Sequence, residues 1–213
     1  MLTLDIETTM AMNHIWCCGI HILGEKRERV LLNPMQLEQH IHGAQTIVGH
    51  NIVNFDAPKI KELWHLSIDG WKLRDTLLMS RLWNPRLLGG HSLGAWGERL
   101  GYAKGDFTDY DGGLSEEMIS YCKRDVSLTV KLEEYLTTAL KKDGFSDESI
   151  QLEHEVALIT SQQEINGFKL DIGRANELLT NLMERMNALE REVQEVFPPL
   201  VEERVSEKTG KKL

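Results

Sequence analysis

Alternating apolar and polar positions mark the beginning of the chain. Leu2, Leu4 and Ile6 are separated by polar residues, which is the period of a β-strand with one apolar face. Two further apolar runs at residues 15–23 and 29–32 flank a glycine and a charged turn, so they predict an antiparallel hairpin next to the first strand. Two more short strands are predicted at residues 46–48 and 71–74.

Helical segments alternate with the later strands. Most of them begin at a residue typical of an N-cap, such as Asn33, Asp75, Ser92 or Ser115. The predicted helices are 34–42, 54–63, 75–82, 92–100 and 115–140. Because strands come first and then alternate with helices, the pattern predicts an α/β fold with a mixed sheet and helices on its faces.

The character of the chain changes after the polar stretch 141–144. Helices are predicted at 147–165 and from Asp171 for about 25 residues, ending before Pro198–Pro199. Apolar residues recur in the second helix at steps of three and four from Leu178 to Val196, which is a narrow seam similar to a coiled-coil stripe. The sequence therefore predicts two parts, a domain over 1–145 and a helical extension over 146–213.

Composition narrows the classes of protein. The chain has 213 residues, is 41% hydrophobic and 27% charged, and contains no apolar run near the ~18 residues of a membrane span. The net charge is −3 over residues 1–145 and −6 over residues 146–213. A broad basic face for nucleic acid is therefore not expected, although carboxylates that bind metal ions remain compatible with a nuclease.

Five polar residues are candidates for chemistry. Asp5 and Glu7 share one face of the first strand, and like charges so close repel each other unless a cation lies between them. Asp56 follows a buried strand, in the first turn of a helix, while Tyr121 and Asp125 are four residues apart on one helical face. Each feature alone has a simpler explanation. Asp5 and Glu7 could form an exposed polar face, Asp56 could cap a helix, and the pair on the late helix could lie at the surface.

The three features in this order resemble the motifs of the DEDD 3'–5' exonucleases, in the branch that carries tyrosine. These motifs are Asp-x-Glu, Asn-x-x-x-Phe-Asp and Tyr-x-x-x-Asp. Segments 75–82, 91–101 and 104–105 are similar to the proofreading domain of family A DNA polymerases of short-tailed bacteriophages. Segment 152–197 resembles the passage from that domain into the polymerase thumb. The resemblance implies a ribonuclease H-like fold, with residues 146–213 as the start of a thumb.

The resemblance also implies a two-metal site that binds Mg²⁺, with Mn²⁺ able to substitute. We expect Asp5 to bridge two ions, Glu7 and Asp125 to complete the site of the ion that binds the attacking water, and Asp56 to hold the second ion. Tyr121 is expected to orient the water, because its ordinary pKa near 10 makes it a poor base at neutral pH.

Contacts to the terminal nucleotide are expected from the residues around the first two motifs. An aromatic ring stacked on a base contributes about 1–3 kcal/mol without regard to sequence, although Phe55 also suits the core. The expected substrate-binding residues are Thr8, Asn51, Asn54 and Phe55.

The sequence thus predicts a metal-dependent 3'–5' DNA exonuclease that proofreads, hydrolysing single-stranded 3' ends to 5' mononucleotides. Two alternatives stay open, an RNA-trimming exoribonuclease and a non-catalytic accessory module of a split polymerase. We expect a polymerase partner, either a separate subunit or a further domain, and no membrane association. The start of the chain lacks a signal peptide pattern, and three cysteines without a Cys-x-x-Cys pair suit a reducing compartment. We therefore expect a cytoplasmic location, the host cytoplasm if the protein is viral.

Overall fold

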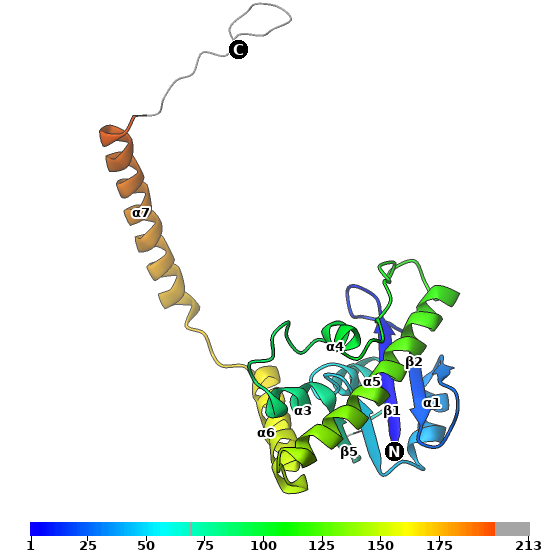
Figure 1. Ribbon diagram of the computed structural model, residues 1–213. Coiled ribbons are helices and arrows are strands. Elements are labelled where there is room, and N and C mark those ends of the chain that lie inside the picture. Colours follow the sequence, from blue (N-terminus) through cyan, green and yellow to red (C-terminus); the bar gives the residue numbers. More distant parts are fainter. Residues whose placement is uncertain (69, 199–213) are drawn as a thin grey trace, which may run out of the picture. The chain divides into compact units, whose positions relative to one another are not determined.

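The computed structural model describes residues 1–68 and 70–198, and its centre is a five-stranded sheet (Figure 1). The strand order is β3-β2-β1-β4-β5, with β2 antiparallel to β1 and β3, and β4 parallel to β1 and β5. The strands are β1 Leu2–Thr8, β2 Ile15–Ile22, β3 Arg29–Leu31, β4 Thr46–Gly49 and β5 Lys72–Asp75. The predicted mixed sheet and its hairpin are therefore confirmed.

Seven helices accompany the sheet in the described residues, and their starts follow the capping chemistry. The side chains of Asn33, Asp75, Ser92 and Ser115 each accept a hydrogen bond from a backbone N–H of the first turn. The helices are α1 Pro34–Ile41, α2 Asp56–Trp64, α3 Thr76–Trp83, α4 Leu93–Arg99, α5 Glu116–Lys142, α6 Asp147–Asn166 and α7 Ile172–Val196.

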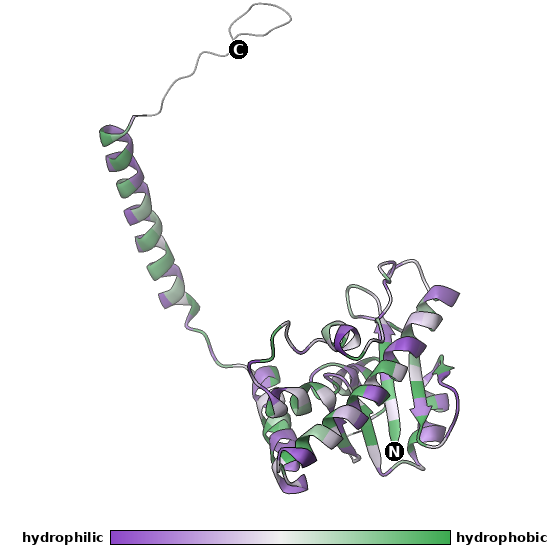
Figure 2. Ribbon diagram, in the orientation of Figure 1, coloured by the Kyte–Doolittle hydropathy of each residue, from purple (hydrophilic) through white to green (hydrophobic). Residues whose placement is uncertain are grey.

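The core has two main parts. One joins the strands to α1 and α2, and the other joins α3 and α4 to α5 and α6. Figure 2 shows apolar residues along the strands, and apolar residues mixed with polar ones along the helices. The long helix α5 crosses the sheet in Figure 1, and it packs against β1, β2, β3 and β4.

Gly19 allows α5 to come close to the sheet. It pairs with Asp5 across β1 and β2, and a Cβ at this position would lie 2.8 Å from both Cys122 Sγ and Val126 Cγ2. Such distances are shorter than real Cβ contacts, so a larger residue would push the helix away. The absence of a side chain at Gly19 thus brings the middle of α5 down to the level of Asp5.

The boundary between compact units falls later than the sequence predicts. The first unit extends from Met1 to Asn166 and includes α6, whereas the predicted boundary follows residue 145. Ile150, His154 and Ala157 of α6 are buried in this unit, which explains why the helix is part of it. The polar stretch 141–144 is only a turn between two packed helices.

The second unit contains α7, which begins at the N-cap Asp171 as predicted. The seam from Leu178 to Val196 is present, and its apolar side chains are about half exposed. Its likeness to a polymerase thumb stays a prediction, and Pro199 lies outside the described residues. Within the described ranges, the helices are all too short or too polar to cross a membrane.

Candidate active site

Asp5 and Glu7 lie on the same face of β1, as their spacing predicts. Asp5 is half-buried and Glu7 is 5% exposed. Ligand atoms of Asp5, Glu7 and Cys122 all lie within 4.8 Å of one another, since α5 packs closely over this part of the strand. A hydrogen bond with Cys17, together with burial, raises the pKa of the Cys122 thiol, so the carboxylates are the better ligands for a hard cation.

Asp56 approaches β1 from the first turn of α2. Its Oδ1 accepts a hydrogen bond from the backbone N–H of Ile6 at 3.1 Å. This N–H is not used in pairing with β4, because β4 pairs with β1 only at Leu2 and Thr3. Burial raises the pKa of Asp56 to about 7. The second motif is therefore attached to the first through the backbone between Asp5 and Glu7.

The turn before Asp56 explains why α2 begins later than predicted. Asn51 has a φ of 65°, in the left-handed region, and its carbonyl accepts hydrogen bonds from the N–H groups of Asn54 and Phe55. Residues 51–54 therefore form a turn, and the helix starts at Asp56. This turn sets the direction from which the Asp56 carboxylate approaches β1.

Asp125 and Tyr121 come from one face of α5, as predicted. Asp125 is 2% exposed and its Oδ2 lies 2.9 Å from Lys104 Nζ. Tyr110 donates a hydrogen bond to the Tyr121 hydroxyl at 3.4 Å. The two tyrosines and Lys104 therefore surround the open side of the acids. A cavity of about 230 Å³ is lined by Asp5, Ile6, Glu7, Thr8, Phe55, Lys104, Tyr110, Tyr121 and Asp125.

The acids are short of positive charge. Burial raises the pKa of Asp5 well above its usual range, and the charges of Asp56, Glu7 and Asp125 raise it further. Burial, followed by the Asp125 charge, raises the pKa of Glu7 to about 8. The pKa of Asp125 is also raised by burial, although Lys104 opposes this shift. A single lysine does not offset this many carboxylates.

Two carboxylate oxygens of the site have no hydrogen-bond partner in the described part of the protein. Among the described residues, Glu7 Oε1 and Asp125 Oδ1 are buried without a hydrogen-bond partner. Buried carboxylate oxygens of this kind are costly unless a donor or a cation satisfies them. Mg²⁺ prefers carboxylate oxygens and keeps several waters, so the donor set fits a divalent cation.

The predicted substrate-binding residues divide into two groups. Thr8 and Phe55 line the cavity. Phe55 also packs against the core, which was the alternative prediction for this residue. Asn51 and Asn54 belong to the turn before Phe55 and are not among the residues that line the cavity. Asp56 is not among them either. The contacts of all these side chains with nucleic acid stay predictions.

Asp75 is a positioning residue whose importance the sequence analysis missed. Beyond capping α3, its carboxylate accepts hydrogen bonds from the N–H groups of Asn51 at 2.8 Å and Val53 at 3.2 Å. It therefore holds the turn that leads to Asp56. Its own N–H donates to His154 Nε2 at 2.7 Å, which ties α6 to the same turn. The only sequence signal was an N-cap at a strand end.

Lys104 and Tyr110 were also missed as members of the site. Lys104 appeared only within a segment of the resemblance, and Tyr110 lies in the irregular stretch before α5. That stretch is held against the β1–β2 side of the site, where Trp16 Nε1 donates to the Tyr110 carbonyl at 2.8 Å. Loop residues carry no periodic pattern, so their side chains are placed only by such long-range contacts.

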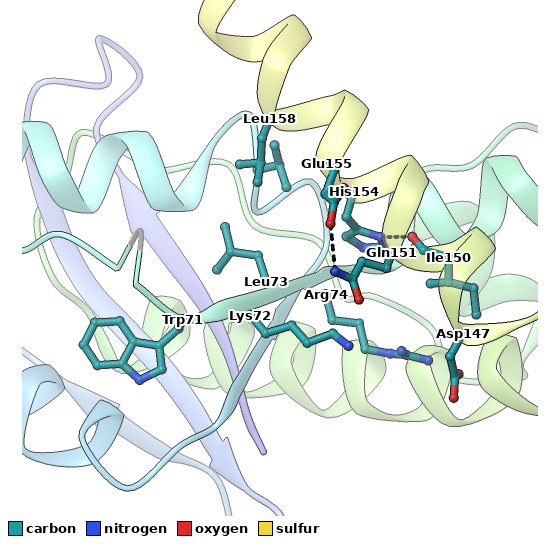
Figure 3. A pocket seen from close by; sticks show the side chains of 11 residues that line it. Trp71, Lys72, Leu73, Arg74, Asp147, Ile150, Gln151, His154, Glu155 and Leu158 are labelled. Atoms are coloured by element: carbon teal, nitrogen blue, oxygen red, sulfur yellow. Dashed lines mark hydrogen bonds between the residues drawn. The ribbon is translucent and has the colours of Figure 1, made fainter.

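A second cavity, of about 290 Å³, lies between β5 and α6 (Figure 3). Trp71 and Leu73 face it from the strand side, and Ile150 and Leu158 from the helix. His154 lines it too, with its Nδ1 2.7 Å from the Ile150 carbonyl. None of the four acids lines this cavity, so the candidate active site is the smaller one.

Comparison with known proteins relates this chain to bacteriophage DNA polymerases. No known protein-family model matches the chain. It is 27% identical to the DNA-directed DNA polymerase of Escherichia phage T7, over 92% of this chain and 37% of that protein. It is 28% identical to the polymerase of Enterobacteria phage T3, over 76% of this chain and 31% of that protein. The chain thus spans about a third of the length of these relatives.

Solved structures with a similar fold include nucleases. Brucella melitensis NrnC has a TM-score of 0.62 at 18% identity, over 80% of this chain and 88% of that one. Escherichia coli RNase D, an exoribonuclease, has a TM-score of 0.58 at 15% identity, over 76% of this chain and 44% of that one. These structures support the predicted ribonuclease H-like fold. Sequence and fold together make this chain similar to the 3'–5' exonuclease domain of a bacteriophage DNA polymerase.

Proposed function

We propose that this protein is a metal-dependent 3'–5' exonuclease that hydrolyses phosphodiester bonds at single-stranded DNA 3' ends and releases 5' mononucleotides. One observation carries the proposal: acids from β1 and α5 line one cavity together with Tyr121, and two of their buried oxygens have no partner in the described residues. The phage relatives are DNA polymerases, which supports DNA as the substrate and proofreading as the role.

The carboxylates divide into a cavity group and a deeper group. Asp5, Glu7 and Asp125 line the cavity and would hold the first divalent ion, with Asp5 also serving the second. Asp56 is occupied by the Ile6 N–H through Oδ1, so we assign it to the second ion through its other oxygen or through water. When bound, Mg²⁺ or Mn²⁺ lowers the pKa of a coordinated water and stabilises charge on the leaving oxygen. A solved relative by fold, NrnC, contains Mg²⁺.

Tyr121 acts as a hydrogen-bond donor to the attacking water and not as the base. Burial raises the pKa of Tyr121 above the ordinary value, so the phenol stays protonated at neutral pH. Tyr110 donates to the Tyr121 oxygen, which leaves the Tyr121 proton for an acceptor on the cavity side. Orientation of the nucleophile is the contribution that this arrangement supports.

We assign the terminal nucleotide to this cavity. Phe55 offers a ring at its edge, and the backbone of Thr8 lies at the end of β1. Stacking on a ring does not distinguish bases, which suits an enzyme that removes any nucleotide. Phe55 therefore serves as the wall against which the last base rests, and its packing into the core makes that wall rigid.

An exoribonuclease is the second candidate, because RNase D shares the fold. Its 15% identity shows the fold alone, whereas the phage polymerases match in sequence over most of this chain. Digestion of DNA and RNA oligonucleotides of one sequence distinguishes the two. Faster digestion of RNA would replace the DNA assignment and leave the chemistry of the site unchanged.

We further propose that a polymerase partner or domain acts together with residues 146–213, in the cytoplasm of a host cell. The likeness to polymerases about three times longer than the matched segment supports this role. The intact acids argue against a purely accessory module, because a non-catalytic domain has no use for costly buried carboxylates.

The test is digestion of a 5'-labelled single strand with Mg²⁺, Mn²⁺ or chelator. We expect stepwise shortening from the 3' end with either ion, none in chelator, and none with Asp5→Ala at an unchanged fold. Glu134→Ala is the matched control, because this acid is exposed on α5 away from the cavity. Digestion by Asp5→Ala at the wild-type rate would remove Asp5 from the mechanism.

A further inference from the structure

Lys104 is the only cation among the described residues that line the candidate active site. Its Nζ lies 2.9 Å from Asp125 Oδ2, and the side chains are 31% and 3% exposed. The same ammonium lies 5.1 Å from the centre of the Tyr121 ring. Lys104 thus occupies a place where acids converge and where the proposed function puts a divalent cation.

Two cations cannot share this position. A divalent ion at Asp125 would lie next to the Lys104 ammonium, and like charges within a few ångströms repel strongly where solvent is partly excluded. Among the described residues, the buried Asp125 Oδ1 has no hydrogen-bond partner, whereas Oδ2 is paired with the ammonium. Full coordination by this carboxylate requires the ammonium to withdraw.

The chain around Lys104 permits such a movement of the side chain. Gly105 has a φ of 56°, in the left-handed region, directly after the lysine. The following stretch is anchored further along, where the N–H of Met10 donates to Asp111 Oδ1 at 3.0 Å. The long, flexible lysine stem can therefore swing while the rest of the loop keeps its contacts.

We propose that Lys104 exchanges partners during binding: its ammonium neutralises Asp125 in the metal-free protein, and on metal binding it moves to a phosphate oxygen of the terminal nucleotide. The proposal rests on the proposed function. Phosphate is the anion that enters this cavity in that function, and a lysine binds it as a point charge. Lys104 then serves both to keep the empty acidic site folded and to hold the substrate.

The experiment compares the full chain with Lys104→Met and with the matched control Lys123→Met, an exposed lysine of α5. Melting temperature in chelator, Mn²⁺ affinity by calorimetry, and affinity for a deoxynucleoside 5'-monophosphate with Mn²⁺ present are measured. We expect Lys104→Met to melt lower in chelator and to bind Mn²⁺ about fivefold more tightly, which corresponds to an ion pair of about 1 kcal/mol. We expect it to bind the nucleotide about fivefold more weakly.

Each outcome decides the proposal. Unchanged Mn²⁺ affinity or unchanged nucleotide affinity in Lys104→Met would overturn the exchange while the proposed function stands. A wild-type chain that binds no Mn²⁺ would overturn both. If Lys104→Met is unfolded in chelator, refolding on addition of Mn²⁺ supports the exchange, and failure to refold overturns it. Lys104→Arg, which keeps the charge, should bind Mn²⁺ like the wild type.

Discussion

Asp56 is hydrogen-bonded to the strand that carries Asp5 and Glu7: its Oδ1 accepts a hydrogen bond from the backbone N–H of Ile6, the residue between them, at 3.1 Å. A carboxylate proposed as a metal ligand is therefore also a structural acceptor. These two roles respond differently to substitution, because an amide can accept the hydrogen bond but is a poorer ligand than a carboxylate.

Asp56→Asn and Asp56→Ala separate the two roles. Both variants should lose exonuclease activity. Asp56→Ala should also lower the free energy of unfolding in chelator by about 1–3 kcal/mol, because it leaves the buried Ile6 N–H without an acceptor. Asp56→Asn keeps an acceptor and removes a charge that disfavours ionised Asp5, so it should be at least as stable as the wild type. Urea unfolding measures this, and equal loss in both variants would contradict it.

The stability of the metal-free protein should fall as the pH rises. The folded-state pKa values of Glu7 and Asp56 are about 8 and about 7, above the ordinary values near 4. The folded state therefore binds these protons more tightly than the unfolded state, so their contribution is complete below about pH 4 and is lost towards pH 8.

Thermal unfolding in chelator between pH 5 and pH 8 measures this loss, which we expect to lower the melting temperature by more than about 5 °C. Addition of Mg²⁺ should reverse most of it at pH 8, because the cation stabilises the ionised carboxylates. A metal-free melting temperature that rises over this range would contradict the raised pKa values.

Tyr121→Phe should lower kcat by about 10- to 100-fold with little change in Mn²⁺ affinity. The ring stays in place against Phe107, whereas the hydroxyl that orients the nucleophile is lost. Because the pKa of this phenol is raised, the wild-type rate should show no loss of activity from its deprotonation up to pH 9. Tyr135→Phe is the control, since Tyr135 is exposed at 41% on the same helix.

The position of the domain boundary can be tested by truncation. Residues 1–166 should fold cooperatively and keep nuclease activity, whereas residues 1–145 should be at least about 2 kcal/mol less stable. The shorter chain loses the buried Ile150 and the acceptor that His154 offers to the Asp75 N–H. Denaturant unfolding of both lengths, with His154→Ala in the full chain for comparison, measures the contribution of α6. Equal stability of the two lengths would favour the predicted boundary after residue 145.

Local patterns were sufficient for most elements of the fold. The alternation over residues 2–7 predicted β1 and placed Asp5 and Glu7 on one face, because successive strand side chains point to opposite faces. The caps at Ser92 and Ser115 located the starts of α4 and α5, because a hydroxyl can satisfy free N–H groups of the first turn. The start of α2 was two residues too early, because the left-handed Asn51 leaves no periodic signal.

What the sequence by itself determined is the set of elements, the identity of the candidate acids and the face on which each neighbouring pair lies. These properties depend on contacts within a few residues, where spacing and propensity act directly. Only the tertiary structure decided that α5 approaches β1 across Gly19, that Lys104 pairs with Asp125, and that α6 supports Asp75 through His154. Such contacts join residues far apart in the chain, and their geometry depends on packing of the whole core, which no local pattern contains.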